Sequence, residues 1–104
     1  MDVLVTPKDA LAVHAAAAAR LLKLVANERR LLILCRLSAV GEASVGELAR
    51  SVGLSQSALS QHLALMREDG LLAFRRDGQT IHYRIADPNA ERLLATLRSI
   101  FCPT

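Results

Sequence analysis

The residues of this chain that could do chemistry are two cysteines, a polar run around Gln56 and a basic pair further along. Cys35 and Cys102 are too few for a disulfide scaffold, and so low a number fits a reducing cytosol. A cysteine inside a Leu-rich run, such as that around Cys35, is usually a small buried hydrophobe. Burial raises the pKa of a thiol and makes it unreactive, so the residues alone favour a structural role for this thiol.

The run that starts at Ser55 has the side chains of a helix that reads DNA. Leu59 and Leu63 repeat at the spacing of a buried helix face. The exposed positions of the first two turns are then Gln56, Ser57, Ser60 and Gln61. Their hydroxyl and amide groups can donate and accept hydrogen bonds, as the base edges of a major groove require. An ordinary polar helix face explains this run equally well when it is taken alone.

A basic pair, Arg75-Arg76, stands beside Asp77-Gly78, a dipeptide that predicts a two-residue hairpin turn with positive φ at both turn positions. Guanidinium groups at such a tip can reach phosphates or a minor groove, although most charged turns are simply solvated. Together with the polar run, this basic hairpin favours DNA binding. The predicted DNA-binding residues are Ser55, Gln56, Ser57, Ser60, Gln61, His62, Arg75 and Arg76.

The histidines and carboxylates form no recognisable site. For His62, near a helix–core boundary, and His82, in a predicted strand, a packing role is more common than a ligand role. The chain has no Cys-x₂-Cys or His-x₃-His pattern, so we predict no metal site and no cofactor. It also has no glycine-rich phosphate loop, nucleophile elbow or paired carboxylates, so we predict that it is not an enzyme.

The first half of the chain predicts three helices that position these residues. A helical pattern opened by Pro7 covers about 8–26. Asn27 is the expected N-cap of a second helix over about 28–39. Ser44 and Glu47 form a capping box for a third helix, which runs to about Val52.

The second half predicts a helix, a hairpin and a last helix. The turn Gly53-Leu54-Ser55 leads into a fourth helix that ends near Asp69, which is helix-turn-helix spacing. Strands are expected over 71–76 and 79–85, and Asp87-Pro88 begins a last helix, which Pro103 ends. The predicted fold class is mainly α with a small β-hairpin, arranged as a winged helix-turn-helix.

Composition narrows the function further. The 104 residues suit one domain, so we expect residues 1–104 to form a single winged helix-turn-helix DNA-binding domain. Aromatic residues make up only 3%, which almost excludes a stacking platform for single strands, and a net charge of +3 makes nucleic acid a plausible partner. We find no convincing secretory signal and no uncharged run of roughly 20 residues, so we expect a soluble cytoplasmic protein without a membrane partner.

Three stretches carry a resemblance to a known family: NERRLLILCRL, VGELARSVGLSQSALSQHLALMREDGLL and RRDGQTIHYRI. They resemble the ArsR/SmtB family of winged-helix repressors. The resemblance implies a homodimer that packs its first and last helices across a two-fold axis and reads double-stranded operator DNA at an imperfect inverted repeat.

The resemblance also bears on the inducer. Metal-sensing members often carry Cys-x-Cys in the third helix or Asp and His ligands on the last one, and this chain departs from both patterns. Cys35 and Cys102 instead resemble the pair of the SqrR/BigR type, which implies a redox-sensing dithiol that persulfides bridge. The Cys35 context matches closely, whereas Cys102 matches in position more than in context. Arg36 and Arg98 are the expected counter-charges for these thiols.

Three alternatives stay open at this point. A metal or metalloid sensor would use the two cysteines with a histidine across the dimer. A peroxide sensor would use the same thiols through a sulfenic acid and a plain disulfide. A protein-interaction module would have the same fold without DNA binding.

Overall fold

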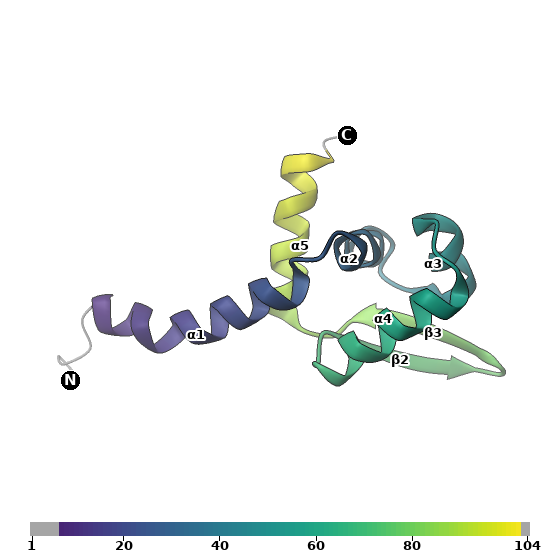
Figure 1. Cartoon of the computed structure of the whole chain (residues 1–104), viewed down its shortest axis with the longest axis horizontal. Coiled ribbons are helices and arrows are strands. Elements are labelled where there is room, and N and C mark those ends of the chain that lie inside the picture. The colour runs from purple at the N-terminus through teal and green to yellow at the C-terminus, as the bar shows by residue number, and fades with distance from the viewer. Residues whose placement is uncertain (1–6, 103–104) are drawn as a thin grey trace.

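The computed structural model describes residues 7–102 of the chain, and the side chains of 12–102 (Figure 1). Five helices and three strands follow one another, and the helices and the hairpin come in the predicted order. Their bounds are α1 Pro7–Val25, α2 Glu28–Val40, β1 Ala43–Ser44, α3 Val45–Val52, α4 Gln56–Glu68, β2 Leu72–Asp77, β3 Thr80–Ile85 and α5 Pro88–Phe101. The predicted fold class is confirmed, and Pro103, the expected end of the last helix, lies outside the described residues.

Local capping sets where the helices begin. The Asn27 side chain accepts hydrogen bonds from the backbone N–H groups of Arg29 and Arg30. At the start of α3, Ser44 Oγ accepts from Glu47 N at 3.2 Å, and Glu47 Oε1 accepts from Ser44 N at 2.8 Å. Each bond satisfies a backbone donor that the helix leaves free, which is why the predicted boundaries agree with the structure.

The sheet differs from the prediction in two respects. It has three strands in the order β1-β3-β2, because Ala43 and Ser44 pair with Tyr83 and His82 of the hairpin. A strand of only two residues, such as β1, is too short to show the alternation by which a strand is predicted from sequence. The expected positive φ at both turn positions is also wrong: Asp77 pairs with Thr80, so the turn is Gly78-Gln79, and among the described residues only glycines have positive φ. A glycine in the first turn position is typical of a type II′ turn.

The core lies where α2, α3, α4 and α5 meet the hairpin. Leu59 and Leu63 of α4 are fully buried, as their spacing predicted, and Met66 is buried with them. They pack in one hydrophobic cluster with Leu34 and Leu37 of α2, Leu48 of α3 and Leu94 of α5. The α4 face opposite these residues is therefore directed outward.

α1 projects from this body as a separate arm (Figure 1). Every side chain from 12 to 20 is exposed, and burial begins only with Leu21, Leu24 and Val25. Within the described residues, no helix combines the length and apolar character needed to cross a membrane.

Candidate functional site

The predicted reading face of α4 is open to solvent. Gln56, Ser57, Ser60 and Gln61 are all exposed, whereas Leu59 and Leu63 on the same helix are buried. The burial of one face rigidly orients the other, so these four polar side chains lie on a fixed surface. The structure thus brings together the four residues that the helical spacing had grouped.

The two flanking residues of the predicted set have other surroundings. Ser55 is the N-cap of α4, and its Oγ accepts a hydrogen bond from Ala58 N at 3.1 Å. His62 is half-buried, lines a hollow with Asn27, Glu28 and Arg29 at the start of α2, and has a buried Nδ1 without a partner. The structure therefore does not place His62 on the polar face of α4.

The two wing arginines point to opposite faces of the hairpin. Arg75 pairs with His82 across the strands and Arg76 with Ile81, so the alternation of side chains separates them. Arg75 Nε donates to both carboxylate oxygens of Glu42, at 3.1 and 2.9 Å, and Arg75 Nη2 donates to Oε1 at 2.8 Å. These bonds lower the pKa of Glu42 and raise that of Arg75. Much of the Arg75 charge is thereby neutralised.

Arg76 lies on the hairpin face that also carries Phe74 and Tyr83. Those two rings pack with their centroids 5.9 Å apart, and the guanidinium of Arg67 on α4 lies 4.9 Å from the Phe74 centroid. This contact ties the base of the wing to the polar helix. Arg76 is the next residue after Phe74 on this face of the hairpin; it lies nearer the hairpin tip and is exposed.

Sequence reasoning missed a hollow where the wing meets two helix N-termini. Its volume is about 440 Å³, and its lining residues are Ser44, Val45, Gly46, Gln56, Gln79, Thr80 and Ile81. The first turns of α3 and α4 both contribute, and helix N-termini favour anions such as phosphates. The capping signals predicted both helix starts, but no local pattern shows that they adjoin the wing.

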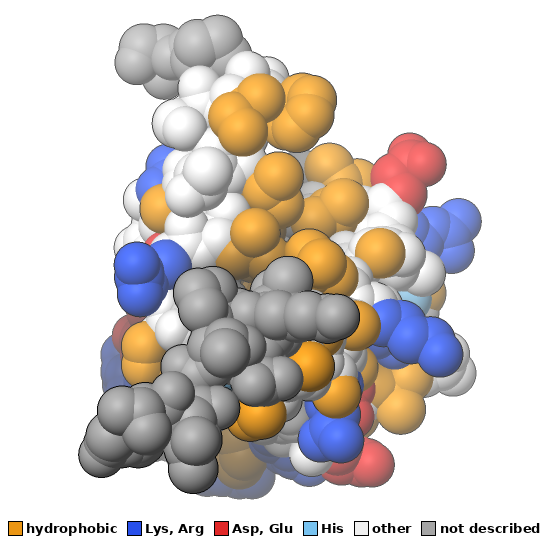
Figure 2. Space-filling view, turned by 90° about the vertical axis from the view of Figure 1, so that its left-hand side faces the viewer, with side chains coloured by type: hydrophobic (Ala, Val, Ile, Leu, Met, Phe, Trp, Pro, Cys, Tyr) orange, Lys and Arg blue, Asp and Glu red, His pale blue; other side chains and the backbone are white. Residues whose placement is uncertain are grey.

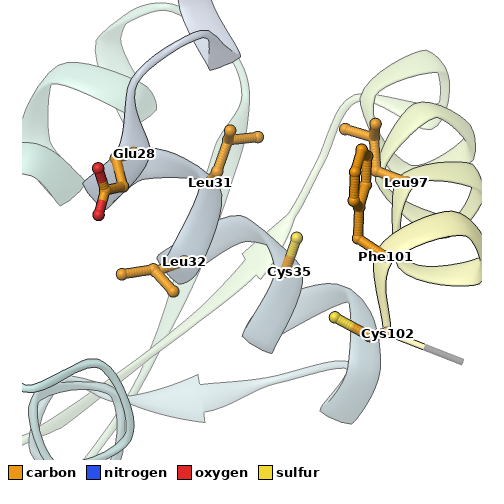
Figure 3. A pocket seen from close by; sticks show the side chains of 7 residues that line it. All are labelled: Glu28, Leu31, Leu32, Cys35, Leu97, Phe101 and Cys102. Atoms are coloured by element: carbon orange, nitrogen blue, oxygen red, sulfur yellow. The ribbon is translucent and has the colours of Figure 1, made fainter. Parts of the chain in front are cut away.

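The two thiols line the same cavity between α2 and α5. The cavity has a volume of about 280 Å³, and its lining residues are Glu28, Leu31, Leu32, Cys35, Leu97, Phe101 and Cys102. Cys35 projects from α2 into this space, and the Cys102 sulfur points from the end of α5 toward α2 (Figure 3). Residues 67 positions apart in the sequence are thus placed in one site.

The two thiols differ in exposure. Cys35 is half-buried, and burial raises its pKa, with the neighbouring Cys102 acting in the same direction and Arg98 lowering it. Cys102 is exposed. Of the two arginines expected as counter-charges, Arg98 acts on Cys35, whereas Arg36 lines a different hollow with Glu47 and Arg50. Neighbours on a helix point about 100° apart, which turns Arg36 away from the thiol.

A polar network joins α2 to α5 beside this cavity. Ser38 Oγ donates to Glu91 Oε1 at 2.8 Å, and Arg98 Nε donates to Ser38 Oγ at 3.1 Å. All three residues are partly buried, so the bonds hold the two helices in one register. Over the described part of the chain, no group of three or more His, Cys, Asp or Glu is arranged to hold a metal ion.

Comparisons with known proteins identify the family. The model for bacterial regulatory proteins of the arsR family matches residues 27–73. The HTH-type transcriptional regulator YgaV of Escherichia coli (strain K12) is 50% identical over 86 residues, which are 83% of this chain and 87% of that protein. The chain belongs to the arsR family.

Solved structures of ArsR-type regulators agree with this assignment. HlyU, a transcriptional regulator from Vibrio vulnificus CMCP6, has a TM-score of 0.87 and 44% identity, covering 93% of this chain and 100% of that one. The transcriptional repressor BigR from Xylella fastidiosa has a TM-score of 0.84 and 36% identity, covering 95% and 100%. The predicted resemblance to the ArsR family and its BigR type is confirmed. The chain is a DNA-binding transcriptional regulator with a winged helix-turn-helix fold.

Proposed function

We propose that residues 1–104 act as one domain of a homodimeric transcriptional repressor whose operator affinity is switched by the Cys35/Cys102 dithiol. The observation that carries the proposal is that both thiols line one cavity between α2 and α5. The reduced dimer binds an imperfect inverted repeat in double-stranded DNA, and a persulfide inducer releases it. The protein works in the cytoplasm, needs no metal or cofactor, and catalyses no reaction.

The inducing step is a sulfur transfer that closes a bridge. A Cys102 thiolate attacks the outer sulfur of a persulfide R–S–SH, giving Cys–S–SH and releasing R–S⁻. A second persulfide lengthens this chain to Cys–S–S–SH in the same way. The Cys35 thiolate then attacks the middle sulfur and expels HS⁻. Two protein thiols and two persulfides thus give a bridge of three sulfur atoms, two R–SH and one H₂S.

Exposure sets the order of the two cysteines. Cys102 is exposed, whereas Cys35 is half-buried and has a raised pKa, so less of it is thiolate at neutral pH. A polysulfide bridge also spans a wider gap than a disulfide, whose Cα atoms lie within about 7 Å. The half-buried thiol therefore closes the bridge instead of starting it.

The bridge affects DNA binding through the dimer. Figure 2 shows apolar side chains gathered along α5 and beside α1, and Leu22, Ile100 and Phe101 there are more than half exposed. An alanine-rich helix such as α1 is marginal in water unless its face is packed. We infer that α1 and α5 cover one another across a two-fold axis. Restraining α5 against α2 then changes the spacing of the two α4 helices in the dimer. A coupling free energy of about 1.4 kcal/mol between the bridge and DNA binding gives a tenfold loss of operator affinity.

On DNA, Gln56, Ser57, Ser60 and Gln61 contact base edges, and Arg76 contacts the backbone or a minor groove. Ser55 and His62 support the helix more than they contact bases, and Arg75 contributes less because Glu42 holds it. Gln56 lines one hollow with Gln79 and Thr80 of the hairpin, so the polar end of α4 lies beside the wing tip, which supports this division of roles.

Fluorescence anisotropy on the DNA upstream of the protein's own gene tests the proposal. The reduced protein binds, glutathione persulfide abolishes binding, a reductant restores it, and rising salt weakens it steeply. The Cys35→Ser variant binds the same DNA but is not released. Release of that variant by persulfide would exclude the dithiol mechanism, whereas zinc or arsenite acting on the wild type would favour a metal sensor.

The dimer is tested separately by sedimentation. Leu22→Asp places a charge on the exposed α1 face and should give monomers that do not bind the operator. Val40→Asp, at the 44% exposed end of α2, is the matched control and should remain dimeric. Dimers that survive Leu22→Asp would show that α1 does not contribute to the interface.

A further inference from the structure

The cavity that holds the two thiols has a wall made almost entirely of carbon. Leu31 of α2 lies on the side toward Leu97 and Phe101 of α5 (Figure 3), and Leu32 also lines the cavity. The weak S–H groups are the only side-chain donors among the lining residues, and none of these residues is cationic. A charged or strongly polar molecule that entered would lose water without gaining a partner, which is costly.

The charges around the cavity repel anions in particular. Glu28 is the single ionised side chain that lines it, and its carboxylate is exposed at the α2 end. The carboxyl end of α5, with its partial negative charge, closes the other side at Cys102. Arg98, the cation that acts on Cys35, donates to Ser38 and is not among the lining residues. An anionic ligand therefore meets the Glu28 carboxylate at one end and the partial negative charge of the α5 terminus at the other, and no cation lines the cavity to bind it.

The size of the cavity limits what can enter. A buried apolar cavity of about 150 Å³ accommodates a benzene-sized molecule. The cavity here is partly open to solvent, and by the same proportion its 280 Å³ holds roughly ten non-hydrogen atoms against the apolar wall. Glutathione persulfide is about twice that size and carries two carboxylates, so it can react at the exposed Cys102 but cannot place its whole body against the apolar wall.

We propose that this cavity selects the sulfur donor: it binds a small, uncharged, apolar persulfide before the sulfur transfer and disfavours anionic carriers. The inference rests on the proposed dithiol function and adds to it the chemical class of the inducer. The bound persulfide gives its outer sulfur to Cys102 and leaves as an apolar thiol. Binding precedes reaction, so the rate saturates with donor concentration.

Two donors that differ by one carboxylate test this selection. Benzyl persulfide and 4-carboxybenzyl persulfide are mixed with the reduced dimer, and bridge formation is followed by intact-protein mass spectrometry. Each rate is divided by the rate of the same donor with free N-acetylcysteine, which removes differences in intrinsic reactivity. The normalised rate should be at least tenfold higher for the benzyl donor, with a hyperbolic concentration dependence for it alone.

Equal normalised rates without saturation would overturn the selection and leave the dithiol switch intact. If neither donor formed a bridge, the dithiol function itself would be wrong, and the selection with it. In the Glu28→Gln variant, the ratio of the normalised benzyl rate to the normalised 4-carboxybenzyl rate should fall at least threefold, because the repelling carboxylate is gone. Glu68→Gln, the same change at an exposed position on α4, should leave the ratio unaltered.

Binding without chemistry provides an independent readout. Benzyl methyl sulfide cannot transfer sulfur, and it can be titrated into the Cys35→Ala, Cys102→Ala double variant. Amide resonances of Leu31 and Leu97 should shift in a saturable way, and 4-carboxybenzyl methyl sulfide should shift them far less. No shift with either compound would exclude an apolar ligand site even if the dithiol switch operates.

Discussion

Arg75 and Glu42 form a bidentate ion pair that joins the outer face of the wing to the residue just before β1, with its shortest contact at 2.8 Å. Arg76, the next residue, is on the opposite face and exposed. Two adjacent arginines that look equivalent in the sequence thus have different surroundings. The first is bonded to the residue before β1, and the second is exposed without that bond.

Replacing these arginines should therefore have unequal effects on DNA binding. Arg76→Ala should weaken operator binding several-fold and reduce the slope of log affinity against log salt by about 1, because one phosphate contact is lost. Arg75→Ala should change affinity less than twofold. Anisotropy over a salt series measures both, and equal losses for the two variants would contradict the division of roles.

The same ion pair predicts a pH dependence of stability. Its bonds lower the pKa of Glu42 in the folded state, so the unfolded state binds a proton first as the pH falls. The stabilisation is present above the unfolded pKa of about 4.3 and is lost as the pH falls through the lower folded value. Urea unfolding from pH 7 to pH 3 should show wild type and Glu42→Gln converging at the acidic end. If the difference in unfolding free energy between the two proteins stayed constant from pH 7 to pH 3, the ion pair would be excluded as the source of that difference.

The exposed glutamines of α4 should carry sequence discrimination. In the proposed function Gln56→Ala and Gln61→Ala each remove an amide that contacts a base edge, and a bidentate contact of this kind is worth about 1–3 kcal/mol of discrimination. Affinity for the operator should fall by about 5- to 150-fold, whereas affinity for unrelated DNA should stay the same. A parallel loss on both DNAs would indicate a backbone contact instead.

Ser55→Ala should act on stability instead of sequence reading. Its hydroxyl caps α4 through Ala58 N, and loss of such a cap costs about 1 kcal/mol. For a domain of this size, that corresponds to a melting temperature lower by about 4–8 °C. Calorimetry measures the shift, and Ser55→Asp should restore most of it, because aspartate caps equally well.

Arg98 should tune the reactivity of Cys35. Its charge lowers the pKa of this thiol against the raising effect of burial, so Arg98→Gln should raise the pKa further. In a Cys102→Ser background, iodoacetamide should then alkylate Cys35 more slowly at pH 8, and the rate profile should move to higher pH. Arg92→Gln, at an exposed position of α5, is the control. An unmoved profile would show that Arg98 acts only through its bond to Ser38.

Sequence by itself determined the helices and the hairpin of this protein, because their signals are local. The Asn27, Ser44, Ser55 and Asp87 caps each bond a backbone N–H within three residues, so their effect does not depend on the rest of the fold. The burial of Leu59 and Leu63 follows in the same way from the period of a helix, and with it the exposure of the polar α4 face. The winged helix-turn-helix is the consequence of these elements in this order.

Only the tertiary structure decided which distant residues meet. Three features depend on how separate elements pack, so no local sequence pattern predicts them. They are strand β1, the Glu42–Arg75 ion pair and the half-buried position of His62. Cys35 and Cys102 are the clearest case: the sequence supplies two thiols, and the packing of α5 on α2 places them in one apolar cavity. The side-chain network of Ser38, Glu91 and Arg98 holds that packing, and it forms only when both helices are already in place.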